Sequence, residues 1–273
     1  MILLGFDVEE FDLPLEYGRP LSFDDQLSIS TNGTNSILEL LRSANIKATF
    51  FCTANYALHK PDIIARIVND GHEISSHGYY HSDFKPEHLK QSKQVLEDIS
   101  GTEVTGFRMA RMMPVDEVEI KKAGYIYNSS INPTWLPGRY NNFDKPRTWF
   151  YDHDVLQIPA SVSPLIRFPL FWLSFHNLPL SLIKWMSSAT HRKDGYLNLY
   201  FHPWEFTNLH HQEKYGLPAY ISRNSGEPFI SRLKNFIEWA QVKGYEFSRT
   251  DNFASSVMKK HAVIKKLVTA HNA

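Results

Sequence analysis

The first ten residues signal both the fold and the chemistry of this chain, because Ile2–Glu10 reads Ile-Leu-Leu-Gly-Phe-Asp-Val-Glu-Glu. Its apolar part, Ile2–Phe6, predicts a buried strand that ends directly in acid. Asp7 and Glu9 are two residues apart, so in an extended chain their side chains face the same side. One carboxylate can then bind a cation while the other accepts a proton. A solvated loop, or a buried acid paired with Arg108, is the alternative interpretation.

Short apolar runs alternate with amphipathic patterns along most of the chain, which is typical of strands that alternate with helices. Strands are expected at Ile2–Phe6, Ala48–Thr53, His72–Ser76, Thr105–Arg108, Tyr125–Tyr127, Val155–Ile158, Tyr196–Phe201 and Tyr245–Phe247. Helices are expected at Asn35–Ser43 behind the candidate caps Thr31 and Asn32, and at Pro61–Asp70, Pro86–Ser100, Val115–Ala123 and Pro228–Lys243. The alternation predicts an α/β fold with a parallel sheet, and about seven or eight such units favour a barrel over an open sheet.

The composition is that of a compact globular domain. The 273-residue chain has 29 basic and 29 acidic side chains, so it carries no formal net charge, and 42% of its residues are hydrophobic. These values exclude a disordered or collagen-like chain and give no electrostatic footprint for nucleic acid. The lone Cys52 cannot form an internal disulfide, and the start of the chain lacks the pattern of an export signal. We expect one domain over 1–273, located in the cytoplasm.

Two segments depart from the alternation. Phe168–Ile183, within an apolar insertion or lid at 163–186, holds no charged residue, but its prolines, His176 and Asn177 argue against a membrane-spanning helix. A buried or lid-like helix pair is expected there. The alternative is an exposed apolar surface for a lipid-bearing substrate or for peripheral contact with the inner face of a membrane. Residues 250–273 are expected to form a helical tail, solvated rather than anchored in a membrane.

Polar side chains gather where the expected parallel strands end, which is where α/β proteins place their working residues. In chain order these residues are Asp7, Glu9, His77, His81, Arg108 and His202. If the chain turns helically after His77, the imidazole of His81 points the same way and both can bind one ion. Two imidazoles and one carboxylate leave positions open for water, as in catalytic zinc sites. The ordinary pKa of a histidine such as His202 suits proton donation near neutral pH.

Together with their neighbours, these residues resemble the ordered motifs of the polysaccharide deacetylase family, which is the NodB-homology group or carbohydrate esterase family 4. The motifs are Phe6–Glu10, the pair His77 and His81, Gly106–Arg108, and Leu199–Glu205 (Leu-Tyr-Phe-His-Pro-Trp-Glu). The resemblance implies an irregular (β/α) barrel of about seven or eight strands, the NodB-like deacetylase fold. It also implies a hydrolase that uses a divalent ion, zinc before cobalt, nickel or manganese, to remove N-acetyl or formyl groups from sugars.

The resemblance assigns roles to individual positions. Asp7 would be the general base, and Arg108 would orient it and hold it as a carboxylate. His202 would be the acid that protonates the leaving amine. Arg111 would bind substrate, with its backbone N–H donating to the oxyanion. The metal ligands that it implies are Glu9, His77 and His81.

The chain departs from the family pattern at several positions. One residue separates the two acids of the first motif, so Glu10 stays a rival metal ligand. Met109–Arg111 lacks the usual proline of the oxyanion loop. Asn128 stands where an acid is common, and Asp152 or Asp154 is expected to support the catalytic histidine in its place.

The sequence thus favours removal of an N-acyl group from an amino sugar of a polysaccharide or a lipid-linked glycan. The alternatives are an allantoinase-like hydrolase of a small cyclic amide and a non-catalytic glycan-binding protein on the same barrel. Tyr80, Trp135 and Trp204 are candidates for stacking on sugar rings, although many aromatic side chains simply fill cores. No pattern in the sequence indicates an oligomeric state.

Overall fold

The structure is a computed structural model that describes residues 1–271, with side chains described as far as residue 263. Its main sheet has the strand order β10-β1-β2-β3-β4-β5-β9-β8, and β11 pairs with the start of β1. The pairs from β10 to β9 are parallel, and β8 runs antiparallel to β9. The strands are β1 (Ile2–Val8), β2 (Thr49–Cys52), β3 (Glu73–Ser76), β4 (Gly106–Phe107), β5 (Tyr127–Asn128), β8 (Phe150–Asp152), β9 (Val155–Gln157), β10 (Leu197–Phe201) and β11 (Phe247–Ser248).

The sheet curls into an irregular barrel, and its two sides are joined by hydrogen bonds beyond the strands. The N–H of Ser161, which follows β9, donates to the carbonyl of Asn198 in β10 at 2.9 Å. The side-chain amide of Asn198 donates to the carbonyls of Ile158 and Pro159 at 2.9 and 3.1 Å. The expected α/β fold with a parallel, curled sheet is therefore confirmed.

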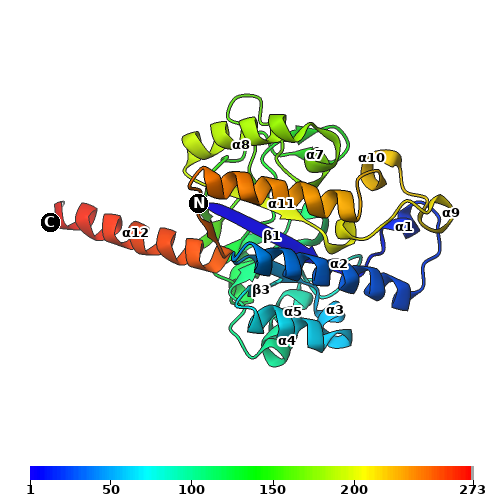
Figure 1. Ribbon diagram of the computed structural model, residues 1–273. Coiled ribbons are helices and arrows are strands. Elements are labelled where there is room, and N and C mark those ends of the chain that lie inside the picture. Colours follow the sequence, from blue (N-terminus) through cyan, green and yellow to red (C-terminus); the bar gives the residue numbers. More distant parts are fainter. Residues whose placement is uncertain (272–273) are drawn as a thin grey trace.

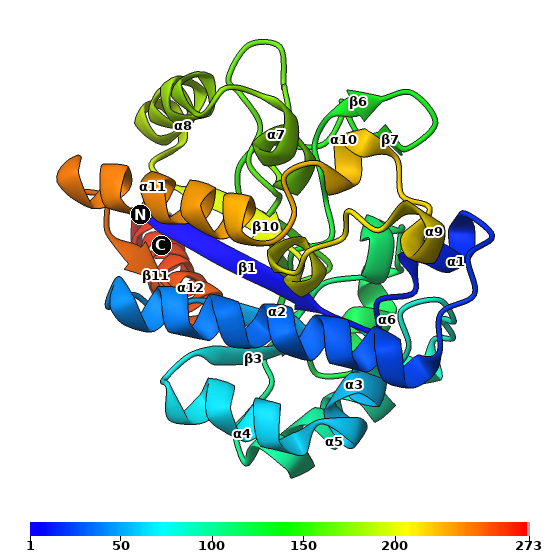
Figure 2. The ribbon, with the colours of Figure 1, turned by 45° about the vertical axis from the view of Figure 1, so that its right-hand side comes forward.

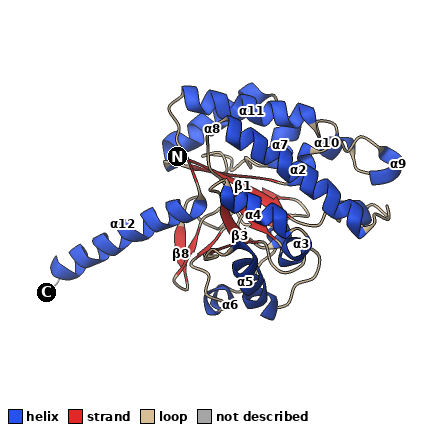
Figure 3. Cartoon of the chain, turned by 60° about the horizontal axis from the view of Figure 1, so that its bottom comes forward, coloured by secondary structure: helices blue, strands red, loops and turns tan. Residues whose placement is uncertain are grey.

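Helices cover the outside of the curled sheet (Figures 1 and 3). The longer ones are α2 (Phe23–Ser43), α4 (Pro61–Asn69), α5 (Glu87–Ser100), α8 (Leu180–Asp194), α11 (Glu227–Val242) and α12 (Thr250–His271). The shorter ones are α1 (Leu13–Glu16), α3 (Ala54–His59), η1 (Ala110–Met112), α6 (Glu117–Lys122), α7 (Trp172–Asn177), η2 (Pro203–Phe206), α9 (Gln212–Tyr215) and α10 (Ala219–Ser222). Within the described residues, no helix combines the length and hydropathy needed to cross a bilayer.

Helix α2 begins twelve residues before the expected start, so the expected caps Thr31 and Asn32 are wrong. Ser22 caps the helix, and its Oγ accepts a hydrogen bond from Asp25 N at 3.1 Å. Ser, Thr, Asn and Gly disfavour helix interiors, which made this half of the helix hard to recognise. Gly33 has a packing reason: a Cβ there would lie 1.8 Å from the carbonyl oxygen of Pro203, so α2 lies directly against η2.

Phe168–Ile183 forms helix α7 and the start of α8, and the turn between them contains Pro179. Helix α7 packs into the body of the molecule, because Phe175 contacts the rings of Phe201 and Phe236 edge-on at about 5 Å. A two-stranded hairpin, β6 (Trp135–Leu136) and β7 (Tyr140–Asn141), lies at the same end of the molecule (Figure 2).

Helix α12 extends from the body of the protein (Figure 1), and its first turn is fixed beneath the barrel. The backbone N–H groups of Thr250 and Asp251 donate to Thr49 Oγ1 at 2.8 Å and to Glu73 Oε2 at 3.0 Å. The described side chains end at 263, so the expected solvation of the tail's lysines at 265 and 266 lies outside the described residues. The single-domain and lid assignments stay predictions.

Candidate metal and catalytic centre

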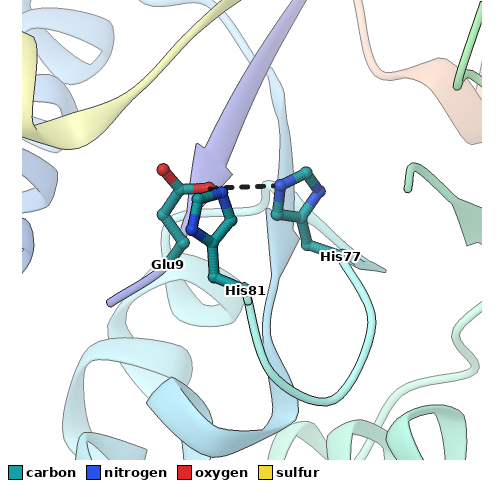
Figure 4. A group of neighbouring side chains, drawn as sticks. All are labelled: Glu9, His77 and His81. Atoms are coloured by element: carbon teal, nitrogen blue, oxygen red, sulfur yellow. Dashed lines mark ion pairs between the residues drawn. The ribbon is translucent and has the colours of Figure 1, made fainter. Parts of the chain in front are cut away.

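Three ligand-type side chains meet where β1 and β3 end. Glu9 follows β1, His77 follows β3, and His81 lies in the next loop. Glu9 Oε2 lies 3.2 Å from His77 Nε2 and 3.0 Å from His81 Nε2, and the ligand atoms of the three residues all lie within 4.8 Å of one another (Figure 4). Both strands are parallel neighbours of β2, so their carboxyl ends reach the same edge of the sheet.

The segment between the two histidines is a loop, so the expected helical turn is wrong. Gly78 has a φ of +88°, a backbone conformation that residues with a side chain rarely adopt. This conformation lets the chain fold back. The first backbone N–H groups of α3 donate to the carbonyls of Gly78 and Tyr79 at 3.0 and 2.9 Å. These bonds bring His81 back beside His77, with the two rings nearly parallel and their centroids 6.1 Å apart.

The cluster fits a divalent cation. Glu9 Oε2 and both ring nitrogens of His77 are buried and form no hydrogen bond of acceptable geometry within the described residues. Unpaired buried polar atoms are costly, and a cation that accepts lone pairs from Glu9 Oε2 and His77 Nε2 removes that cost for these two atoms. Two imidazoles and one carboxylate also match the donor set of catalytic zinc sites, in which water takes the open position.

Without a cation, Glu9 and His81 favour their charged forms, and binding of a cation has to change this charge distribution. Burial raises the pKa of Glu9, but the charge of His81 and the contacts with both imidazoles outweigh burial and hold this pKa well below its usual value. Burial lowers the pKa of His81, whereas Glu9 and Asp12 raise it, to about 10 overall. A cation therefore has to displace a proton from His81, because only a neutral imidazole nitrogen ligates metal.

Asp12 and Trp204 orient the ligands, a role that the sequence predicted for neither residue. Asp12 Oδ1 lies 2.7 Å from Nδ1 of His81, which fixes the ring so that Nε2 faces Glu9. Trp204 Nε1 donates to Glu9 Oε1 at 3.3 Å and leaves Oε2 for the cluster. Asp12 stands on no recognisable motif, and its partner is 69 residues away, so no local signal identifies it.

Glu10 points elsewhere, so Glu9 is the acid of the cluster. Thr53 Oγ1 donates to Glu10 Oε2 at 2.8 Å, and the side-chain amide of Asn55 donates to Oε1. Both partners flank the start of α3. Glu10 thus joins the first strand to α3 and is satisfied without a cation.

Asp7 and Arg108 form a buried pair at the centre of the barrel. Arg108 Nη1 donates to Asp7 Oδ1 at 2.7 Å, and both side chains are almost fully buried. The remaining guanidinium donors bind the carbonyl and Oγ of Ser129 at 3.2 and 3.0 Å, and the ring of Phe51 lies 3.9 Å beneath the guanidinium carbon. Gly5 makes room for this group, because a Cβ there would lie 2.6 Å from Nη1. Asp7 is therefore held in one orientation.

His202 belongs to a second buried network. Its Nδ1 lies 3.0 Å from Glu205 Oε1, and its backbone N–H donates to the same oxygen at 2.6 Å. Glu205 Oε2 lies 3.0 Å from Nε2 of His176, and Glu205 and His176 are fully buried. Burial lowers the pKa of His202, but the bond to Glu205 and the charges of Glu9, Glu205 and Asp7 raise it above its ordinary value. The imidazolium form needed for an acid is thereby favoured.

Glu205 takes the supporting position that we expected of Asp152 or Asp154, so that expectation is wrong. Asp152 Oδ1 lies 2.8 Å from the exposed ring of His153, and Asp154 pairs with Lys121 at 2.5 Å. Both acids lie at the β8–β9 turn, away from His202. The i,i+3 spacing of His202 and Glu205 was the signal that could have identified the true partner.

A cavity of about 490 Å³ opens above the centre, and we call it the catalytic cavity. Glu9, His81, Arg111, His202 and Trp204 line it, whereas Asp7 and His77 are buried and do not line it. The other candidates for sugar contact lie apart. Tyr80 lines a neighbouring hollow beside His81, and Trp135, which is 60% exposed, lines a third one.

Trp204 is only 3% exposed, so its contacts are mainly with the protein. Its ring lies nearly parallel to the imidazole of His202 with the centroids 4.9 Å apart, and it also meets Trp172 edge-on at 5.3 Å. The arrangement favours a role in positioning His202 and Glu9 over a role as an open platform for a sugar ring.

The turn around Arg111 adopts an unusual backbone. Arg111 and Met112 have φ values of +58° and +51°, a conformation that costs energy for residues with side chains. The side chain of Arg111 is fixed by Glu16 at 2.5 Å and by Ser82 Oγ at 3.0 Å. Backbone strain of this kind concentrates at functional sites, and Arg111 lines the catalytic cavity.

Comparison with known sequences points to one family. The sequence profile of the polysaccharide deacetylase family matches residues 20–126. The chain is 34% identical over 95 residues to the peptidoglycan-N-acetylglucosamine deacetylase of Listeria monocytogenes, covering 34% of this chain and 19% of that protein. It is 27% identical over 150 residues to the peptidoglycan-N-acetylmuramic acid deacetylase of Bacillus subtilis, covering 50% of this chain and 54% of that protein. The matches thus span little more than half of these relatives at most.

Comparison with solved structures supports the same fold. A protein assigned as a polysaccharide deacetylase from Mycobacterium smegmatis superposes with a TM-score of 0.66 at 17% identity, covering 95% of this chain and 90% of that one. The allantoinase Puue superposes with a TM-score of 0.67 at 17% identity, covering 93% and 88%. At such identities the likeness shows the fold alone. The resemblance that the sequence motifs indicated is confirmed.

Proposed function

Since the polysaccharide deacetylase family is the one that this chain resembles in both sequence and fold, we propose that the protein is a metal-dependent hydrolase of N-acylated amino sugars. The substrate is an N-acetyl, or less commonly N-formyl, group on a polysaccharide or lipid-linked glycan. The observation that carries the proposal is the cluster of Glu9, His77 and His81, whose ligand atoms lie within 4.8 Å of one another. The bond that breaks is a carbon–nitrogen amide bond, and the products are a carboxylic acid and a free amine.

The proposed mechanism divides the chemistry between the two buried networks. When bound to Glu9, His77 and His81, a divalent cation would polarise the amide carbonyl and lower the pKa of a water molecule. Asp7, held by Arg108 at 2.7 Å, accepts the proton of the attacking water. Asp7 lies behind the lining of the cavity, and the variant Asp7→Asn tests its role as the base.

Collapse of the tetrahedral adduct needs a proton on nitrogen, since an amide anion is a very poor leaving group. His202 lines the cavity, and Glu205 holds its Nδ1, so Nε2 is the atom that donates this proton. The backbone N–H of Arg111 is the proposed donor to the oxyanion, in the strained turn described above.

Release of acetate from a chitooligosaccharide tests the proposal. Metal-free protein is supplied with Zn²⁺ or Co²⁺ and incubated with N-acetylated chitopentaose, and acetate and new amines are counted. Equal amounts of both, dependent on the added metal, are expected. Sugar binding without either product would instead support a non-catalytic glycan-binding protein.

An allantoinase-like activity is the second candidate, and the fold similarity to Puue allantoinase is the observation that favours testing it. Allantoin is assayed under the same conditions. Turnover of allantoin in metal-free protein, with none of chitopentaose in any metal, would replace the proposed function.

A further inference from the structure

A second cavity of about 430 Å³ adjoins the catalytic cavity, and we call it the apolar groove. The hairpin β6–β7, helix α7 and helix α10 contribute to its walls, and these elements gather at one end of the molecule (Figure 2). Ile166, Phe168 and Leu178 line it together with Trp135. The proposed reaction does not use the groove, because none of its lining residues belongs to the metal cluster or to the two buried networks.

The groove offers a ligand mainly apolar surface. Apart from the aromatic residues Trp135 and Tyr220, its polar side chains are Thr134, Arg167, Ser174 and Asn177. Each of the four donates to a protein carbonyl, at distances of 2.7 to 2.8 Å. Each of these four side chains thus uses at least one donor within the protein itself, and most of the surface left for a ligand is apolar.

The groove and the catalytic cavity are neighbours and share part of their lining. Leu136, Phe171, Leu173 and Tyr220 line both hollows. A ligand that places one end beside His202 can therefore extend past these four side chains into the groove.

The outer end of the groove opens among apolar side chains that face solvent. Ile166 is 74% exposed and Leu165, its neighbour in the chain, is 91% exposed. Large apolar residues at such exposure commonly mark a surface that meets another apolar phase. A chain longer than the groove would leave it at this edge, where a bilayer or micelle can take up the remainder.

We propose that the apolar groove binds the hydrocarbon chain of an amphiphilic glycan whose N-acylated sugar occupies the catalytic cavity. The inference rests on the proposed function for the placement of the sugar. The volume of the groove lies in the range of small-molecule pockets, whereas a stable protein partner needs roughly 800 Å² of contact surface on each side. The lining shared with the catalytic cavity and the exposed apolar edge both favour a chain attached to the substrate.

Two synthetic substrates separate the groove from the catalytic centre: the methyl and the octyl glycoside of N-acetylglucosamine, both kept below the micellar concentration. Burial of two or three methylene groups is enough to tighten binding about tenfold. We expect the octyl glycoside to have a KM at least about tenfold lower than that of the methyl glycoside, with similar kcat. Equal KM values for both glycosides would overturn the inference and leave the proposed hydrolase intact.

Exposed positions provide variants that leave the core untouched. Ile166→Glu places a charge in the groove and should abolish the octyl preference without changing turnover of the methyl glycoside. Val242, which is 87% exposed at the end of α11 and lines no described cavity, gives the matched control Val242→Glu. An octyl preference that survives in Ile166→Glu would contradict the inference.

Binding measured by calorimetry on metal-free protein keeps the test independent of catalysis. The octyl glycoside should bind the wild type and Val242→Glu, and Ile166→Glu should weaken this binding about tenfold. If no N-acylated sugar is hydrolysed but this pattern is found, the groove stands and the proposed function fails. Equal binding of the octyl glycoside by all three proteins would refute the groove.

Discussion

At the scale of single residues, the chemistry depends on acids with different partners. Asp7 is paired with Arg108, Glu9 with two imidazoles, Glu10 with Thr53 and Asn55. Neighbours along the chain thus have separate tasks because each carboxylate meets a different part of the fold. This division leads to two predictions about individual side chains.

Asp7→Asn should keep the metal and lose the activity. The amide preserves the size of the side chain and can still contact Arg108, but it cannot accept the proton of water. We expect kcat to fall by at least about a hundredfold, the usual contribution of a general base. Acetate release and metal content are measured on the same sample. Unchanged turnover would remove Asp7 from the role of base.

Glu205→Gln should move the alkaline limb of the pH–rate profile to lower pH. Burial lowers the pKa of His202, and Glu205 is the first of the groups that raise it. Loss of the Glu205 charge therefore lets His202 lose its proton at a lower pH. Asp152→Asn is the control, because Asp152 contacts His153 instead. A shift in the control, with none in Glu205→Gln, would show that the supporting acid has been assigned wrongly.

At the scale of elements, helices and turns act as supports for the centre. Helix α2 contacts η2 at Gly33. The turn η2 begins directly after His202 and contains Glu205. Helix α12 begins at Thr250, and the backbone N–H of its second residue, Asp251, donates to the carboxylate of Glu73 in β3. We expect the stability of the protein to depend on both contacts.

Gly33→Ala should destabilise the protein and disturb catalysis together. Its Cβ would lie 1.8 Å from the carbonyl oxygen of Pro203, so the helix or the turn must move. Overpacking of this kind costs about 1–3 kcal/mol, and displacement of η2 should also lower kcat. Urea unfolding measures the first effect, with Asn32→Ala, at the exposed neighbouring position, as control. Identical midpoints for the two variants would contradict the close packing.

Glu73 should make the protein less stable as the pH rises. Burial, and then the charge of Asp251, raise its pKa from 4.5 to about 7. The folded state therefore holds more protons than the unfolded state between about pH 4.5 and 7, and stability falls across this window by of the order of 1–3 kcal/mol. Glu73→Gln stays neutral and should flatten the dependence of Tm on pH.

The control for Glu73 is Glu238→Gln, which changes an exposed acid on α11. Its Tm should follow that of the wild type at every pH. Parallel curves for the wild type and Glu73→Gln would show that Glu73 does not titrate in this window.

At the scale of the whole molecule, the sequence predicted the convergence of the site because parallel strands end on one edge. The strand-end rule placed Asp7, Glu9, His77, Arg108 and His202 together, and the structure brings them to one end of the barrel. It could not reveal contacts made by loops. Such contacts depend on turns like the one at Gly78, which no periodicity describes.

The errors have the same physical origin. Local helix propensity does not predict the start of α2, because this half of the helix depends on the packing of Gly33 against Pro203, which lies far away in the chain. The acid that supports His202 was expected at Asp152 or Asp154. Instead Glu205 contacts His202 across an i,i+3 turn, and His176 of α7 holds the other carboxylate oxygen of Glu205. Tertiary contacts decided both cases.

The most direct measurement of the central claim is zinc affinity by competition with a chelator, for the wild type and for Glu9→Gln, His77→Ala, His81→Ala and Glu10→Gln. We predict one zinc ion per chain in the wild type and in Glu10→Gln, with equal affinity. Each of the other three variants should bind more weakly by over a hundredfold, since loss of an orienting partner alone costs about 10–100-fold. Zinc lost in Glu10→Gln, or held unchanged after removal of either imidazole, would contradict the account.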